Sequence, residues 1–94
     1  VSNVYVNAGF PRPGGNACDQ YYWYCHSNDL SELRPGMMVA VPTHNHTQAG
    51  KKYGHVGVYV GNGIIRENIG IVKDTKLSDW IAYYGSSAKW GFPY

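Results

Sequence analysis

The most constraining feature of the chain is a short apolar segment that begins at a histidine and closes on a glycine-rich turn. Residues 55–60 alternate, so that His55, Gly57 and Tyr59 share one face of a strand and three valines share the other. A Gly-Asn-Gly turn follows at residues 61–63, and a second run of strand-forming residues covers 64–68. This pattern predicts a β-hairpin that holds one histidine at a fixed place on a sheet.

The length of the turn decides which side chain of the second strand faces His55. A three-residue turn pairs Gly57 with Glu67 and places Glu67 diagonally across from His55 on the same face. A two-residue turn, which Asn-Gly favours, brings Arg66 and Asn68 to that face instead. A carboxylate beside His55 would fix the ring tautomer and leave one nitrogen free as a base. A backbone carbonyl can also satisfy a strand-end histidine, so both registers and both interpretations stay open.

Apolar residues at helical spacing predict three helices in the rest of the chain. Residues 1–8 carry such a stripe without a capping residue before it, so we expect the C-terminal part of a helix that starts upstream. A second helix is predicted to begin after Asn16 and to end near His26 or Ser27, and a third covers residues 77–84.

The remaining pattern predicts a small sheet. A buried strand is expected at residues 37–41, a short strand at 70–73 and an edge strand at 89–92, whereas residues 43–54 are expected to form a polar loop. Helices that precede a meander of strands indicate an α+β fold, with N-terminal helices packed on a small antiparallel sheet. The length of 94 residues suits one domain spanning 1–94.

Composition excludes several classes of function. A formal net charge of +2 is too small to indicate a nucleic-acid-binding protein. No apolar run approaches the roughly 20 residues of a membrane span. His44, His46 and His55 do not show the tight ligand spacing of a zinc site, so we expect no metal and no cofactor.

The two cysteines are predicted to be free thiols on the second helix. Cys18 and Cys25 share a predicted stripe with Tyr21 and Tyr22, and the helical rise between the cysteines, about 10.5 Å, is too long for a disulfide. A cysteine in such a stripe is usually a small core residue. The alternative is that Cys18 acts as a thiolate nucleophile near the helix N-terminus, where the helix dipole favours negative charge.

Four segments together resemble the NlpC/P60 family of cysteine peptidases, which cut bacterial cell-wall peptides. The segment from His55 to Gly63 resembles the family's histidine strand and turn, and Glu67 falls where the family carries its third polar catalytic residue. Residues 33–39 resemble the segment before the first core strand. Residues 1–12 resemble the helix after the catalytic cysteine and the turn that ends it, and residues 19–21 fit the short helix that follows.

The resemblance implies a papain-like fold and a Cys-His-polar triad, with His55 and Glu67 as catalytic residues. The cysteine is then expected about one turn upstream of Val1, whereas Cys18 aligns with the second helix. Met37 stands where the family usually has Asp, and Glu as third residue is familiar in the related CHAP amidase and peptidase domains.

By the same resemblance, we expect a monomer that acts on peptidoglycan stem peptides outside the cell, in the cell envelope or in a phage particle. The 94-residue chain alone is expected to be inactive. The competing expectation is a non-catalytic relative that binds wall fragments or a protein partner.

Overall fold

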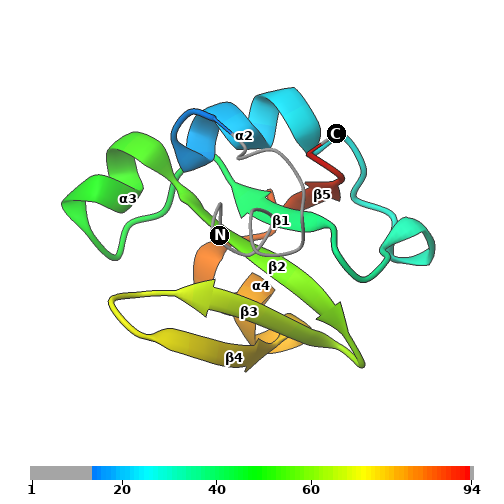
Figure 1. Cartoon of the computed structure of the whole chain (residues 1–94). Coiled ribbons are helices and arrows are strands. Elements are labelled where there is room, and N and C mark those ends of the chain that lie inside the picture. Colours follow the sequence, from blue (N-terminus) through cyan, green and yellow to red (C-terminus); the bar gives the residue numbers. More distant parts are fainter. Residues whose placement is uncertain (1–13, 94) are drawn as a thin grey trace.

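A five-stranded antiparallel sheet organises the part of the chain that the computed structural model describes, residues 14–93 (Figure 1). The spatial order is β4-β3-β2-β1-β5, formed by β1 (Met38–Val41), β2 (His55–Gly61), β3 (Ile64–Asn68), β4 (Val72–Lys76) and β5 (Lys89–Gly91). The helices are α2 (Ala17–Tyr24), α3 (Gln48–Tyr53) and α4 (Leu77–Tyr84), with a short 3₁₀ turn, η1 (Leu30–Glu32). The structure confirms the predicted α+β class with an antiparallel sheet. The helix predicted at residues 1–8 lies outside the described residues.

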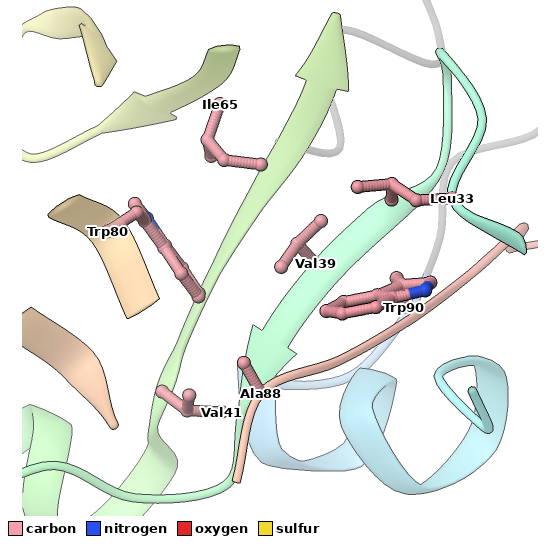
Figure 2. Close-up of a cluster of buried hydrophobic side chains, with 7 residues drawn as sticks. All are labelled: Leu33, Val39, Val41, Ile65, Trp80, Ala88 and Trp90. Atoms are coloured by element: carbon pink, nitrogen blue, oxygen red, sulfur yellow. The ribbon is translucent and has the colours of Figure 1, made fainter. Parts of the chain in front are cut away.

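Strand β1 forms the centre of the core because both of its faces are covered. Its four residues are fully buried. Val39 and Val41 pack with Trp80 of α4 on one face (Figure 2), while Met38 and Ala40 pack with the α2 side on the other. Helices α2 and α4 therefore cover opposite faces of the sheet (Figure 1). A continuous apolar run is the expected sequence of a strand buried in this way.

The hairpin between β2 and β3 combines the two turn lengths that the sequence left open. The turn residues Asn62 and Gly63 both have positive φ, 54° and 74°, as a two-residue Asn-Gly turn requires. A bulge between Tyr59 and Gly61 then adds one residue to β2. Beyond the bulge, Tyr59 pairs with Ile65, which is the register of the three-residue turn. Consequently Glu67, rather than Arg66 or Asn68, shares the face of His55.

Helix α2 differs from its prediction in its end and in its buried face. It ends at Tyr24 rather than near His26, and Cys25 already has an extended conformation. Tyr22, predicted to lie on the buried stripe, is 67% exposed, whereas Gln20 is buried. Gln20 is held by a hydrogen bond from its side-chain amide to the Gly14 carbonyl at 3.2 Å. The spacing of apolar side chains could not reveal a buried polar residue with its own partner.

Helix α3 replaces part of the polar loop predicted at residues 43–54. Thr47 is its N-cap, and the Thr47 hydroxyl accepts a hydrogen bond from the Gly50 amide at 2.8 Å. The helix ends at Gly54, which has a φ of 73°. Its six residues, QAGKKY, carry no apolar stripe, so only the capping residues signalled it.

The other predicted elements are confirmed with shifted bounds. Helix α4 covers residues 77–84 as expected, with Trp80 buried and Leu77, Ile81 and Tyr84 packed against the core. Strand β5 lies at an edge of the sheet, and β4 extends three residues further than the predicted strand at 70–73. Among the described residues, no helix has both the length and the apolar character needed to cross a membrane.

The two cysteines are free, as predicted, and differ in their surroundings. Cys25 is only 2% exposed, and burial raises the pKa of its thiol to about 12. Roughly one Cys25 in 10⁴ would then be a thiolate at pH 8, and the thiolate is the reactive form. Cys18 is partly exposed.

We therefore expect iodoacetamide to modify Cys18 of the folded protein and to leave Cys25 unmodified until urea unfolds the chain. Peptide mapping by mass spectrometry, with and without urea, measures both sites in one sample. Equal labelling of the two thiols without urea would contradict the burial of Cys25.

Candidate active site

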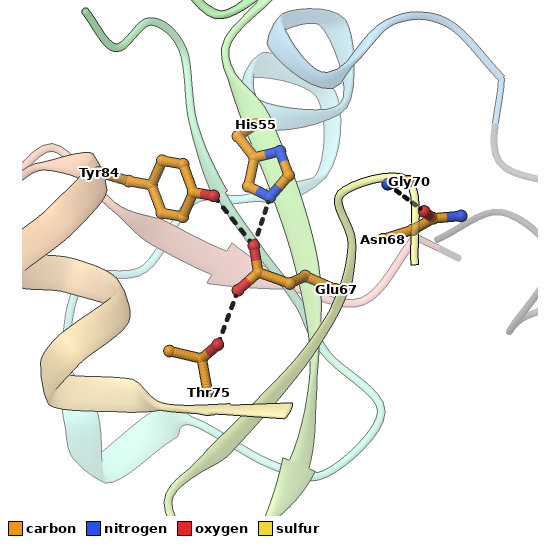
Figure 3. A network of polar contacts seen from close by, with 6 residues as sticks. All are labelled: His55, Glu67, Asn68, Gly70, Thr75 and Tyr84. Atoms are coloured by element: carbon orange, nitrogen blue, oxygen red, sulfur yellow. Dashed lines mark hydrogen bonds and ion pairs between the residues drawn. The ribbon is translucent and has the colours of Figure 1, made fainter. Parts of the chain in front are cut away.

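The candidate site is a histidine–carboxylate pair on the α4 face of the sheet (Figure 3). His55 begins β2 and Glu67 lies near the end of β3. The Nε2 atom of His55 lies 2.8 Å from Oε1 of Glu67. The Glu67 side chain is 3% exposed and that of His55 is 18% exposed. The hydrogen bond is therefore shielded from water on the carboxylate side, while the imidazole stays accessible.

Three donors surround the Glu67 carboxylate. Besides His55, the Tyr84 hydroxyl donates to Oε1 at 3.0 Å and the Thr75 hydroxyl donates to Oε2 at 3.0 Å (Figure 3). Hydrogen bonds of this kind stabilise an ionised carboxylate in a buried place. An ionised carboxylate only accepts, so Nε2 of His55 carries a hydrogen and the neutral ring has a bare Nδ1. Figure 3 shows this second nitrogen pointing away from Glu67.

Gly57 makes room for the pair in the middle of β2. A Cβ atom at this position would lie 2.5 Å from Cγ2 of Ile65 and 3.7 Å from Cβ of Glu67. The space that Gly57 leaves beside His55 is thus filled by two side chains of β3. A side chain at Gly57 would clash with Ile65, which would have to shift, whereas its contact with Glu67 would be an ordinary van der Waals contact.

Aromatic rings of α4 fix the plane of the imidazole. The Tyr84 ring stacks on the His55 ring with centroids 4.5 Å apart and an interplanar angle of 25°. The Trp80 ring lies 6.0 Å from the same imidazole and is fully buried. Within residues 14–93, the Trp80 indole nitrogen has no hydrogen-bond partner. Of these two aromatic residues, Tyr84 contacts both members of the pair: its ring stacks on His55 and its hydroxyl donates to Glu67.

Two further histidines extend the site from the segment before α3. His44 is 9% exposed, and its Nδ1 accepts a hydrogen bond from the His46 amide at 3.2 Å. Its ring meets those of His55 and Tyr84 edge to face. A Cβ atom at Gly50 would overlap the His44 ring, so this position must be glycine for the ring to pack there.

The burial of His44 predicts a pH-dependent stability. Burial, and then the neighbouring His55 and His46, lowers the pKa of His44 below its ordinary value of 6.5. The unfolded chain then binds this proton more readily than the folded chain. The stability associated with neutral His44 is complete above about pH 6.5 and is lost progressively below it.

We expect the melting temperature to fall less between pH 7 and pH 5 in His44→Gln than in the wild type, as measured by calorimetry. His26→Gln is the control because His26 is exposed. If the His44 and His26 variants lose the same number of degrees over this pH range, buried His44 is not the titrating group.

A cavity of about 710 Å³ adjoins the pair on the side of Glu67. It shares Glu67, Thr75 and Tyr84 with the hydrogen-bond network. Its other lining residues are mostly aromatic or charged, with one threonine and one isoleucine, and come from α4, β4 and the segments around α3 and β3: His44, His46, Thr47, Ile69, Lys73, Asp74, Lys76, Asp79, Trp80 and Tyr83. The volume lies within the range of about 300–1,000 Å³ typical of ligand sites.

The alternatives to Glu67 have other partners. Arg66 binds both carboxylate oxygens of Asp74, at 2.8 and 3.1 Å, across β3 and β4. The Asn68 side chain accepts a hydrogen bond from the Gly70 amide at 2.9 Å. Neither residue contacts the imidazole within residues 14–93. Of the two registers that the sequence left open, the structure has the one in which Glu67 faces His55.

Neither thiol of the described residues joins the pair. Cys25 packs with Met38 and Ala40 on the α2 face of the sheet, opposite to His55, and its Sγ lies 3.8 Å from the Met38 carbonyl oxygen. Cys18 lies on α2, which covers the same face. Within residues 14–93, no group of three or more histidine, cysteine, aspartate or glutamate side chains is arranged to hold a metal ion.

Sequence reasoning did not find Tyr84, Thr75 or His44 as parts of the site. Tyr84 was predicted only as an apolar position of a helix, and its hydroxyl contact to Glu67 spans 17 positions. His44 was considered only as a metal ligand. Thr75 lies beyond the strand predicted at residues 70–73, so no local signal pointed to it; the structure extends that strand to Lys76.

Comparisons with models of known protein families, with curated proteins and with solved structures give no match.

Proposed function

We propose that this domain is a cell-wall peptide hydrolase of the papain-like type, in which His55 and Glu67 are two members of a Cys-His-Glu triad. The observation that carries the proposal is the oriented imidazole: Nε2 lies 2.8 Å from an oxygen of a buried carboxylate, and within residues 14–93 Nδ1 has no hydrogen-bond partner. A base in this state needs a nucleophile on its Nδ1 side. The resemblance to the NlpC/P60 family supplies the expected nucleophile, a cysteine upstream of Val1.

The proposed reaction moves one proton through His55 in each half. Nδ1 takes the thiol proton, and the thiolate attacks the peptide carbonyl to form a tetrahedral oxyanion. The oxyanion collapses, the C–N bond breaks, and the imidazolium gives its proton to the leaving amine. Water then attacks the thioester while Nδ1 takes its proton, and the thiolate leaves and is reprotonated from the imidazolium.

Glu67 orients the imidazole during both halves of this reaction. Its buried carboxylate stabilises the imidazolium that forms when Nδ1 takes a proton. The Tyr84 and Thr75 hydroxyls hold the carboxylate in place, since each donates to one of its oxygens. NlpC/P60 enzymes more often have another polar residue in this role. A glutamate therefore favours an amidase or peptidase of the CHAP type.

The expected substrate is a peptidoglycan stem peptide or a cross-bridge. The cavity beside Glu67 offers aromatic rings from Tyr83 and Tyr84 together with charged side chains. A peptide chain with alternating apolar and polar groups suits such a lining. Extracellular, cell-envelope or phage-particle location follows from the substrate and belongs to the same proposal.

The test is a digestion of purified peptidoglycan by the full-length natural protein that contains these residues. Mass spectrometry of the soluble products would show new amino and carboxyl ends if a peptide or amide bond is cut. Pretreatment with iodoacetamide should abolish the products if a thiolate is the nucleophile. Product formation that survives this treatment would exclude the cysteine mechanism.

A second candidate is a binding module that keeps the fold without catalysis. It is favoured by one observation: neither Cys18 nor Cys25 contacts His55 in the described residues. Such a module would sediment with insoluble walls in the same assay and release no products. A cysteine one turn before Val1 in the natural protein supports the enzyme, and serine or alanine there supports the module.

A further inference from the structure

Lys73 of β4 has an unusual position beside the histidine–carboxylate pair. It is the direct cross-strand partner of Glu67. Side chains paired in this way share one face of the sheet with Cβ atoms about 4.5–5.5 Å apart. Opposite charges so placed normally form an ion pair. Among the described residues the ion pairs are His55–Glu67 and Arg66–Asp74, so Lys73 does not pair with the glutamate beside it.

Three other donors already surround the buried Glu67 carboxylate. Oε1 accepts from His55 and Tyr84, and Oε2 accepts from the Thr75 hydroxyl two residues along β4. Lys73 is exposed and lines the cavity of about 710 Å³. Its ammonium group is therefore left for a ligand next to the proposed catalytic pair.

The other charges of the cavity do not cancel Lys73. Asp74 is held by Arg66 through two hydrogen bonds. The Glu67 carboxylate keeps its negative charge, but it is only 3% exposed and so is less accessible to a ligand than the exposed charges. Apart from Asp74, the exposed charges of the lining are two lysines, Lys73 and Lys76, against the single acid Asp79. The local balance favours an anionic group on the ligand.

A stacked pair of aromatic rings lines the same cavity and is formed without a ligand. The rings of His46 and Tyr83 stack with centroids 3.7 Å apart and an interplanar angle of 6°. The Nε2 atom of His46 also lies 2.6 Å from the Tyr83 carbonyl oxygen, which fixes the stack at the end of α4. Flat rings of this kind bind a peptide chain by packing, and the free ammonium can then select the charge that the peptide carries.

We propose that the cavity is a substrate subsite that selects peptides with a free carboxylate, and that Lys73 is the residue that determines this selection. This inference rests on the proposed function and names the chemistry of its substrate. The carboxylate of the peptide would accept hydrogen bonds from the Lys73 ammonium, while the neighbouring part of the peptide packs on Tyr83. Conversion of the carboxylate to a carboxamide removes the charge and leaves the shape almost unchanged.

The experiment compares a wall stem tripeptide that has free carboxylates with the same tripeptide in which they are carboxamides. Binding to the full-length protein is measured by calorimetry after treatment with iodoacetamide, so that turnover does not interfere and the His55–Glu67 pair is kept. We expect the carboxylate form to bind about tenfold more tightly. Lys73→Gln should reduce this preference to less than about twofold, and Lys73→Arg should retain it, because arginine keeps the charge.

Lys51→Gln is the matched control because it removes the same charge from α3, outside the cavity lining. It should leave the preference unchanged. Equal affinity for the two peptides, or an equal loss in the Lys51 and Lys73 variants, would overturn the subsite. Lys73 would then act only as a charge on an exposed sheet edge.

The result is separable from the proposed enzyme activity. Wall digestion by the wild type without a carboxylate preference would leave the hydrolase in place and remove the subsite. A carboxylate preference that depends on Lys73, in a protein that cuts no wall, would support the subsite and remove the hydrolase.

Discussion

His55→Ala should lower wall hydrolysis by the full-length protein by at least about 10³-fold, because general acid–base transfer and activation of the nucleophile are lost together. KM should change much less, since His55 does not line the cavity proposed to bind the peptide. Initial rates of product release, measured by mass spectrometry over a range of peptide concentrations, separate kcat from KM.

His26→Ala is the control for this loss. His26 is exposed, and its ring contacts the Trp23 carbonyl near the end of α2, away from the pair. The His26→Ala variant should keep the wild-type rate of wall hydrolysis. Full turnover in His55→Ala would show that the imidazole has no role in the chemistry.

Glu67→Leu should damage both the stability and the activity of the protein. Its side chain is 3% exposed, and its removal leaves the donors of His55, Tyr84 and Thr75 without their acceptor. Buried donors without partners cost roughly 1–3 kcal/mol each, less where water can reach them, so we expect a loss of about 2–4 kcal/mol in the free energy of unfolding. Urea denaturation followed by circular dichroism measures this loss.

Glu67→Gln separates orientation from stability. The amide oxygen can still accept hydrogen bonds, so unfolding should be affected less than in the leucine variant, while the negative charge that stabilises the imidazolium is gone. We expect kcat to fall about 10²-fold or more with a folded protein. Glu32→Gln, at an exposed glutamate on η1, should change neither quantity. An unchanged kcat in Glu67→Gln would mean that the carboxylate only supports the fold.

The hairpin shows how much of the site the sequence could predict. Its strands follow from the alternation of residues 55–60 and from the Asn-Gly turn, and the resemblance to the NlpC/P60 family points to Glu67, twelve residues after His55. The strand register remained open because a two-residue turn and a three-residue turn place different side chains of the second strand beside His55. A bulge between Tyr59 and Gly61 satisfies both, and nothing local in the sequence requires a bulge at that place.

The rest of the site depends on contacts between distant segments. Tyr84 reaches Glu67 because α4 packs across the sheet. His44, in the segment just before α3, contacts the Tyr84 ring. Helical spacing predicted α4 correctly but could not say that its last tyrosine would donate to a carboxylate. Helix α3 was not predicted because its N-cap residue, Thr47, was the only local sign of a helix in a polar stretch.

The central claim is that His55 is an oriented base, and the tautomer of its ring tests this most directly. Nitrogen-15 NMR of the uniformly labelled 94-residue chain above pH 8 distinguishes a protonated from a bare ring nitrogen at each position. The geometry predicts a hydrogen on Nε2, held by Glu67 at 2.8 Å, and a bare Nδ1. A hydrogen on Nδ1 with a bare Nε2, or rapid exchange between the two tautomers that Glu67→Gln leaves unchanged, would contradict the account.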